Sequence, residues 1–167
     1  MPRPDEIVPR SDEIVRALRA QHATVATAES LTGGAVCAAL IEAPGASAVV
    51  RGGIVAYTPA MKAALLGVDP DLIATAGIVS AEVAAAMARG ARDATGASFA
   101  VATTGAAGPE PHDGAPPGRV WIAVETPRGV RTLHLDIDGD RAAVRTASVA
   151  GALDLLDATL RGSVTQP

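Results

Sequence analysis

The chain is short of aromatic residues, of cysteine and of lysine, and each shortage restricts what the protein can be. One Trp, one Tyr and one Phe account for 2% of the 167 residues, so the core has to be built from Ala, Val, Leu and Ile. The single cysteine, Cys37, excludes an internal disulfide, fits a reducing compartment and is expected to be a small core residue. Lys62 is the only lysine among 14 basic residues. Lysine can lose its charge near pH 7 when it is buried, whereas arginine cannot, which makes this position informative.

Several classes of site are missing as well. The net charge is −4, so the chain lacks the clustered excess of Lys and Arg that a nucleic-acid-binding surface requires. No apolar run approaches the length of a membrane span, and residues 1–6 contain no apolar signal core. The three histidines have no metal-ligand spacing, and no P-loop, GxGxxG or GxSxG motif is present. We therefore expect a cytoplasmic protein with no nucleic-acid or membrane partner, no metal and no cofactor.

The order of predicted strands and helices indicates a single α/β domain. The length suits one substantial core and is too short for two ordinary domains. Strands alternate with helices and a hairpin with a final helix follows, which favours a mixed sheet covered by helices on both faces. We expect a flexible lead-in over residues 1–10, one domain over 11–162 and a tail over 163–167. The expected strands lie at residues 24–28, 49–57, 98–103, 120–126 and 130–137.

The segment AESLTGG at residues 28–34 joins a predicted strand to a predicted helix. Ser30 and Thr32 supply hydroxyls there, while Gly33 and Gly34 leave the backbone open to close approach. Such a junction can bind an anion, because the first N–H groups of a helix lack internal partners. It can also present a nucleophilic serine beside an oxyanion site. A hydroxyl helix cap with glycines for close packing explains the segment equally well.

Tyr57 and Lys62 flank a second helix start, Thr58-Pro59. A lysine in the first turn of a helix is disfavoured by the helix dipole, and burial would lower its pKa further. Lys62 would then suit the role of a base toward a serine. The alternative, a solvated surface lysine, stays open on this evidence.

A further junction at the end of the third strand carries Thr104, Gly105, Ala107 and Gly108, followed by a long Gly- and Pro-rich loop over residues 105–118. Ligands of open α/β sheets bind outside the carboxyl ends of strands, so this junction and the Ser30 junction could face one pocket. Arg141 and Arg145 lie one helical turn apart at the start of the last helix. They could grip a phosphate or a carboxylate, or they could form a solvated, salt-bridged face.

Taken together and in order, these segments resemble the CinA C-terminal domain family, also called nicotinamide-nucleotide amidase. The resemblance covers residues 11–160. It rests on TAESLTGG at 27–34, GIVAY at 53–57 with Lys62, LGV at 66–68, GIVSAE at 77–82, TTGAAGP at 103–109, GRVWIA at 118–123, and GDR at 139–141 with Arg145. Where members often carry Ser-Asn after the tyrosine and Gly-Gly in the later loop, this chain has Thr58-Pro59 and EPHDG at 110–114.

The resemblance implies a three-layer α/β/α sandwich with a mixed, mostly parallel sheet and a C-terminal β-hairpin plus helix. It implies hydrolysis of the carboxamide of nicotinamide mononucleotide to nicotinic acid mononucleotide and ammonia, in pyridine-nucleotide salvage. Ser30 would be the nucleophile, Lys62 its base, and Tyr57 a group that orients Lys62 or relays a proton. The substrate would contact Thr32, Gly33, Gly34, Thr104, Gly105, Ala107, Gly108, Arg141 and Arg145.

A second hypothesis from the same residues is a non-catalytic nucleotide-binding or regulatory module of the competence/damage-inducible type. The Ser30 and Lys62 pair favours the enzyme, because a binding protein has little need of a lysine that can be neutral beside a serine. The alanine-rich helices and small core also lead us to expect a homo-oligomer.

Overall fold

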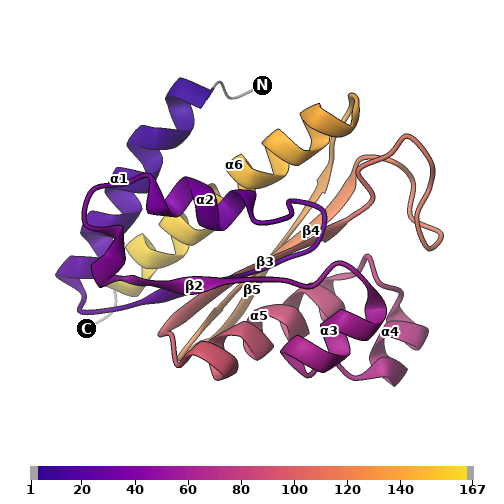
Figure 1. Ribbon diagram of the computed structural model, residues 1–167, viewed down its shortest axis with the longest axis horizontal. Helices are drawn as coiled ribbons and strands as arrows, with labels where there is room; N and C mark the ends of the chain where they lie inside the picture. The colour runs from indigo at the N-terminus through magenta and orange to yellow at the C-terminus, as the bar shows by residue number, and fades with distance from the viewer. Residues whose placement is uncertain (1–3, 165–167) are drawn as a thin grey trace.

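The computed structural model describes residues 4–164, in which six α-helices surround one five-stranded mixed sheet (Figure 1). The α/β fold predicted from the sequence is confirmed, including the terminal hairpin and helix. The elements are α1 (Pro4–Ala20), β1 (Val25–Glu29), α2 (Ala35–Ile41), the 3-10 turn η1 (Ala46–Ala48), β2 (Val50–Val55), α3 (Pro59–Leu66), α4 (Pro70–Ala76), α5 (Ala81–Thr95), β3 (Phe99–Gly105), β4 (Arg119–Thr126), β5 (Gly129–Asp136) and α6 (Arg141–Val164).

The order of the strands, β2-β1-β3-β4-β5, brings several chain segments to one edge of the sheet. The strands β1, β2 and β3 are parallel, and Glu29 pairs with both Val55 and Thr103, so all three end at the same level. Strand β4 is antiparallel to β3 and to β5, so β4 starts at this edge and β5 ends there. The loops after β1, β2, β3 and β5 therefore all lie on one side of the molecule.

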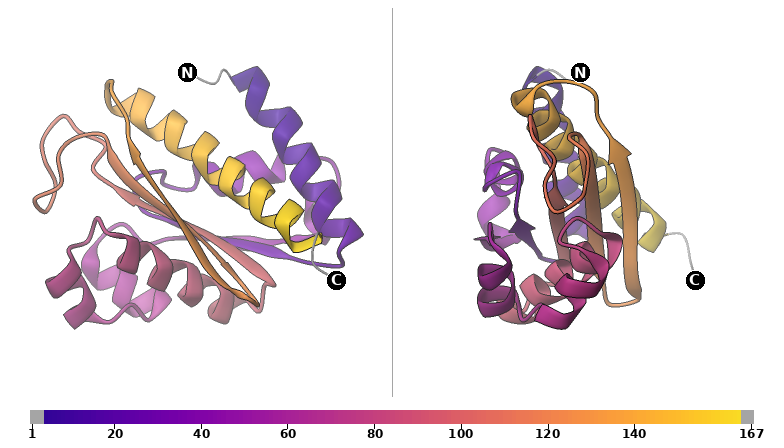
Figure 2. Two further views of the ribbon diagram at one scale, coloured as in Figure 1. Left: turned by 180° about the vertical axis from the view of Figure 1, so that it is seen from behind. Right: turned by 90° about the vertical axis from the view of Figure 1, so that its right-hand side faces the viewer.

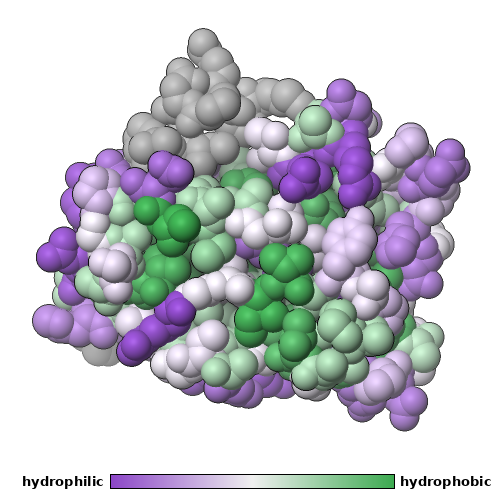
Figure 3. Space-filling model, in the orientation of Figure 1, coloured by the Kyte–Doolittle hydropathy of each residue, from purple (hydrophilic) through white to green (hydrophobic). Residues whose placement is uncertain are grey.

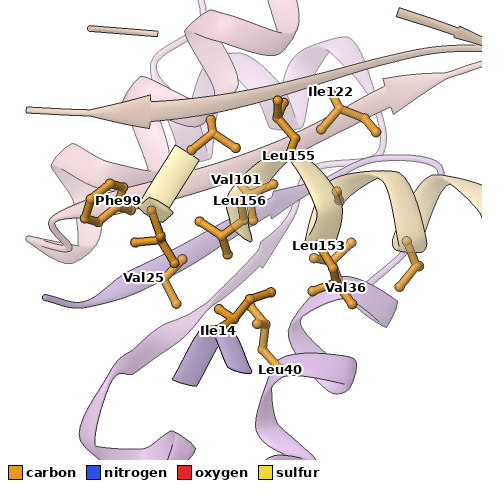
Figure 4. Close-up of a cluster of buried hydrophobic side chains, with 14 of the residues drawn as sticks. Ile14, Val25, Val36, Leu40, Phe99, Val101, Ile122, Leu153, Leu155 and Leu156 are labelled. Carbon is orange, nitrogen blue, oxygen red and sulfur yellow. The ribbon is translucent and has the colours of Figure 1, made fainter. Parts of the chain in front are cut away.

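The two faces of the sheet are covered by different helices (Figure 2) and packed by different side chains. Helices α1, α2 and α6 cover one face, where Leu40, Leu153 and Leu156 meet Val101 and other large residues of the strands (Figure 4). Helices α3, α4 and α5 cover the other face, where the strands present small residues, Ala28, Ala100, Ala102 and Ala123. Alanine on the sheet and alanine on α5 let this helix pack closely, so a core with few aromatic residues is still filled.

Helix α1 begins at Pro4, so most of the flexible lead-in expected over residues 1–10 is helical. Proline is accepted at the first helical position because its missing N–H has no partner to lose there. At the other end, α6 runs to Val164 and so includes the first two residues of the tail expected over 163–167. The remainder of the expected lead-in and tail, residues 1–3 and 165–167, lies outside the described residues.

Large apolar side chains are exposed near the edge strand β2. Val55, Met61 and Leu65 are 41–47% exposed, and Tyr57 and Ile41 are more exposed still. Figure 3 shows a group of hydrophobic atoms over the region of β2 and α3. Among the described helices, none combines the length and apolar character needed to cross a membrane.

Candidate active site

Lys62 and Ser30 meet below the edge of the sheet where β1 and β2 end. The Lys62 Nζ lies 2.9 Å from Ser30 Oγ and donates a second hydrogen bond of 2.8 Å to the Ala56 carbonyl. Lys62 has no exposed surface, and Ser30 is 7% exposed. Burial lowers the pKa of Lys62 to about 8. The surface-lysine alternative is thus wrong, and the lysine sits within proton-transfer distance of the serine.

The local sequence explains how Lys62 reaches this place. Helix α3 starts as predicted, with the Thr58 hydroxyl accepting a hydrogen bond from the Met61 N–H and Pro59 at the first helical position. Side chains on a helix lean toward its N-terminus. Lys62, one turn into α3, therefore points back toward Ala56 and the end of β2, where Ser30 lies beside it.

The turn that carries Ser30 is organised by Glu29, a residue that the sequence analysis did not single out. The fully buried Glu29 carboxylate accepts hydrogen bonds of 2.8–3.0 Å from the N–H groups of Gly34, Val36 and Cys37, and one from the Thr27 hydroxyl. An acidic residue directly before a glycine-rich helix start was the available signal. The anion that this helix start accommodates is thus a carboxylate of the chain itself.

Beside Ser30 lies a cavity of about 320 Å³, enclosed largely by the loop after β3. Gly105, Ala107 and Gly108 line it, so this junction and the Ser30 junction face one cavity. Tyr57 and Arg141 form another wall. The Arg141 guanidinium donates hydrogen bonds to the Tyr57 hydroxyl (3.0 Å) and to the Gly108 carbonyl (3.2 Å). The hydroxyl of Tyr57 thus meets Arg141 rather than Lys62.

The remaining predicted site residues take part in other contacts. Thr32 binds Thr103 through their hydroxyls at 2.7 Å, and the buried Thr104 hydroxyl donates to the Ile78 carbonyl at 2.8 Å. Arg145 donates to the Leu31 and Thr32 carbonyls. The lining of the cavity comprises Ser30, Leu31, Tyr57, Thr58, Pro59, Gly105, Ala106, Ala107, Gly108, Pro109, Glu110, Pro111, His112 and Arg141, so it does not include Thr32, Gly33, Gly34, Thr104 or Arg145.

Cys37 is only partly buried, contrary to the core position expected, and burial together with the Glu29 carboxylate raises the pKa of its thiol. Within residues 4–164, no three His, Cys, Asp or Glu side chains are grouped so that they could hold a metal ion. The contact in this site that can support chemistry is the one between the Ser30 hydroxyl and the Lys62 amine. A serine hydroxyl bonded to a lysine that is readily neutral is the arrangement of a nucleophile with its base.

Comparison with known proteins places the chain in a family. The chain belongs to the CinA C-terminal domain family, whose model matches residues 8–160. The nicotinamide-nucleotide amidohydrolase PncC of Pseudomonas putida is 44% identical over 151 residues, which cover 90% of this chain and 94% of that protein. A CinA-like protein of Frankia casuarinae is 48% identical over 140 residues. The match covers 84% of this chain but 32% of that relative, so the chain spans about a third of its length.

Solved structures agree with the fold. A CinA superfamily protein from Klebsiella pneumoniae superposes with a TM-score of 0.90 at 32% identity, covering 93% of this chain and 98% of that one. The competence/damage inducible protein CihA from Agrobacterium tumefaciens gives a TM-score of 0.89 at 37% identity, with 96% and 99% covered.

Proposed function

We propose that the protein is an amidohydrolase that converts nicotinamide mononucleotide to nicotinic acid mononucleotide and ammonia, a reaction of pyridine-nucleotide salvage in the cytoplasm. The observation that carries the proposal is the 2.9 Å hydrogen bond between the buried Lys62 ammonium and Ser30 Oγ at the rim of a cavity. The name of the Pseudomonas putida relative, matched over nearly its whole length, supports the choice of substrate.

In the first half of the reaction, neutral Lys62 takes the proton of Ser30 while Ser30 Oγ attacks the carboxamide carbon. The tetrahedral intermediate collapses as the protonated Lys62 gives its proton to the leaving nitrogen, so ammonia departs and an ester to Ser30 remains. The Ala56 carbonyl stabilises the protonated lysine, because it accepts a hydrogen bond from Lys62 Nζ. No base other than Lys62 is needed in this half-reaction.

In the second half, Lys62 deprotonates a water molecule that attacks the ester carbon. Ser30 Oγ then leaves and recovers its proton from Lys62, which releases nicotinic acid mononucleotide and restores the starting state. Lys62 can serve in both halves of the reaction, because in each half it first takes up one proton and then gives that proton back.

The substrate would lie in the cavity with its carboxamide at Ser30 and its phosphate toward Arg141. Arg141 lines the cavity and is tied to Tyr57 and Gly108 through two of its nitrogens, which holds the guanidinium in place for an anion. Gly105, Ala107 and Gly108 would contact the substrate through their backbone. The resemblance implied substrate contacts for four residues that instead support this wall from behind, and we propose no such contact for them: Thr32, Gly33, Gly34 and Thr104.

The decisive test is ammonia release from nicotinamide mononucleotide, with the acid product identified by mass spectrometry. We expect Ser30→Ala and Lys62→Ala each to lower kcat at least about a thousandfold with the fold retained. Ser47→Ala, at an exposed serine of η1, is the matched control and should leave the rate unchanged. A wild-type protein that binds the nucleotide without releasing ammonia would replace this proposal by the binding or regulatory module.

A further inference from the structure

We propose that Arg145 is a positioning residue that holds the Ser30 turn in its reactive shape, and that it does not bind the substrate. This inference rests on the proposed function, in which Ser30 is the nucleophile. It departs from the expectation that either arginine of α6 could grip the phosphate.

The contacts of Arg145 are with the backbone next to Ser30. The guanidinium donates through Nε to the Leu31 carbonyl and through Nη2 to the Thr32 carbonyl, both at 2.9 Å. These two carbonyls belong to the residues directly after Ser30, and Arg145 reaches them across 114 and 113 positions of the sequence. A planar fork with fixed donors suits two neighbouring oxygens, and a lysine ammonium has no such fixed fork.

The other side of the same turn is held from within the chain. In a trans peptide the C=O and the following N–H point in opposite directions. While the Thr32 carbonyl faces Arg145, the Gly33 N–H of that peptide faces the opposite way and donates to the Ser30 carbonyl at 3.1 Å. The hydrogen bond from Arg145 therefore polarises the peptide that closes the turn, and each bond strengthens the other.

Beyond the turn, the Glu29 carboxylate accepts hydrogen bonds from the N–H groups of Gly34, Val36 and Cys37. The segment that carries Ser30 is thus fixed by a carboxylate on its N–H side and by a guanidinium on its carbonyl side. Glu29 is buried in the fold, whereas Arg145 is only partly buried at the start of α6. Arg145 is therefore the partner that can be removed with less risk to folding.

Arg141, one helical turn earlier, provides the contrast. Its guanidinium lines the cavity, whereas the cavity lining does not include Arg145. Loss of Arg141 is expected to raise KM, because a ligand contact is lost. Loss of Arg145 is expected to lower kcat with KM within about twofold, because the serine is misplaced while the cavity wall remains.

The test measures the reactivity of Ser30 directly as well as turnover. A small fluorophosphonate, which phosphonylates activated serines without needing a phosphate site, is followed by intact-protein and peptide mass spectrometry. We expect Arg145→Ala to slow both the labelling of Ser30 and kcat by about 10–100-fold, since a shift of the order of 1 Å has such effects. Arg145→Lys should give an intermediate rate, and added guanidinium ion should restore part of the rate to Arg145→Ala.

Arg131→Ala is the control, because Arg131 is an exposed arginine of β5 with no side-chain hydrogen bond or ion pair to the side chains described over residues 10–162. Thermal unfolding is measured for every variant, and if Arg145→Ala does not fold, Arg145→Lys and Arg145→Gln carry the test. Unchanged labelling of Ser30 in folded variants, or an effect on KM alone, would overturn the inference. If the fluorophosphonate labels Ser30 of the wild type but no ammonia is released, nicotinamide mononucleotide is not the substrate. The labelling rates of the Arg145 variants then still test the positioning role of Arg145. Wild-type Ser30 that labels no faster than Ser47 would overturn the inference itself.

Discussion

At the scale of single residues, the unusual group is a lysine buried without a carboxylate. The Lys62 ammonium contacts two neutral oxygens, from Ser30 and Ala56, and no salt bridge joins it to the side chains described over residues 10–162. A buried charge with neutral partners favours release of the proton, which is why the pKa of Lys62 falls to about 8. A base for serine needs this property near neutral pH.

The pH dependence of the amidase reaction follows from this pKa. Only neutral Lys62 can take the serine proton, so kcat/KM is expected to rise about tenfold per pH unit below pH 8 and to level off above it. The measurement is the pH profile of kcat/KM between about pH 6 and 9.5. Lys62→Arg should be inactive at every pH, because the guanidinium stays protonated. A flat profile across this range would contradict the assignment of Lys62 as the base.

The burial of Lys62 also lowers the free energy of unfolding of the protein. The pKa of Lys62 is about 8 when folded against 10.5 as its ordinary value, so the unfolded chain binds more protons between these two pH values and stability rises with pH through this window. At pH 7 the penalty is of the order of 3 kcal/mol. Lys62→Met removes this penalty, but it also removes the hydrogen bond to the Ala56 carbonyl, which contributes about 1 kcal/mol. The substitution should therefore stabilise the protein by about 1–2 kcal/mol at pH 7.

Urea unfolding of the wild type and Lys62→Met at pH 7 and pH 10 checks this expectation. The advantage of methionine should shrink by about 2 kcal/mol at the higher pH, because the wild-type lysine is then neutral when folded and largely free of its penalty. Equal differences at both pH values would show that the charge of Lys62 is not the cause.

At the scale of elements, the close packing of α5 against α3 sets where Lys62 lies. Gly90 of α5 has no space for a side chain, because a Cβ there would overlap the Leu66 carbonyl at the end of α3. Gly90→Ala must push away the helix that carries Lys62. We expect it to cost about 2–3 kcal/mol of stability and to lower kcat. Thermal unfolding and the ammonia assay measure the two effects.

Gly162→Ala is the matched substitution in α6, where a Cβ meets nothing within 4 Å. It should leave activity unchanged and stabilise the protein by about 0.5–1 kcal/mol through helix propensity. Similar stabilities for the two alanine variants would refute the close-approach argument for Gly90.

The positions of many helices and strands could be predicted from the sequence, because the signals for them lie within a few residues. The cap at Thr58 starts α3 as expected, and Ser80 caps α5 in the same way, since each hydroxyl accepts a hydrogen bond from the N–H three residues ahead. Gly53 in β2 is a local signal too, because a glycine inside a strand marks a bulge or a close approach of other atoms. A Cβ there would lie 2.6 Å from the Thr27 hydroxyl and 2.8 Å from Cys37 Cβ.

The parts that could not be predicted depend on how distant elements cross. Arg141 and Arg145 share a helix face by spacing, but the path of α6 over the sheet decides which one meets the cavity and which one meets the Ser30 turn. The direction of Tyr57 was equally open, because Arg141, its partner, lies 84 positions away. Glu29 was missed because a carboxylate at the end of a strand is ordinarily expected to be exposed to solvent. Its burial becomes evident only when the position of α2 is known.

At the scale of the whole molecule, the topology of the sheet assembles the site. Because β1, β2, β3 and β5 all end at one edge, the serine turn, α3, the loop after β3 and the start of α6 converge there from four parts of the chain. The edge strand β2, next to this site, leaves Val55 exposed beside Met61 and Leu65 of α3. The homo-oligomer expected from the sequence stays a prediction, and this apolar surface is where we expect a second copy to bind.

Leu65→Glu tests that surface. Leu65 is 47% exposed, so the substitution should leave the monomer folded, while a buried carboxylate at an interface between two copies would be strongly unfavourable. Sedimentation velocity at several protein concentrations should show a wild-type oligomer that Leu65→Glu converts to a monomer. Val130→Glu, at an exposed apolar residue of β5, is the control and should not change the mass. A wild type that is monomeric at every concentration, or an oligomer that survives Leu65→Glu, would show that β2 and α3 do not form an interface. Because Tyr57 adjoins this surface and also lines the cavity, dissociation into monomers should in addition raise KM, which the ammonia assay measures on the same samples.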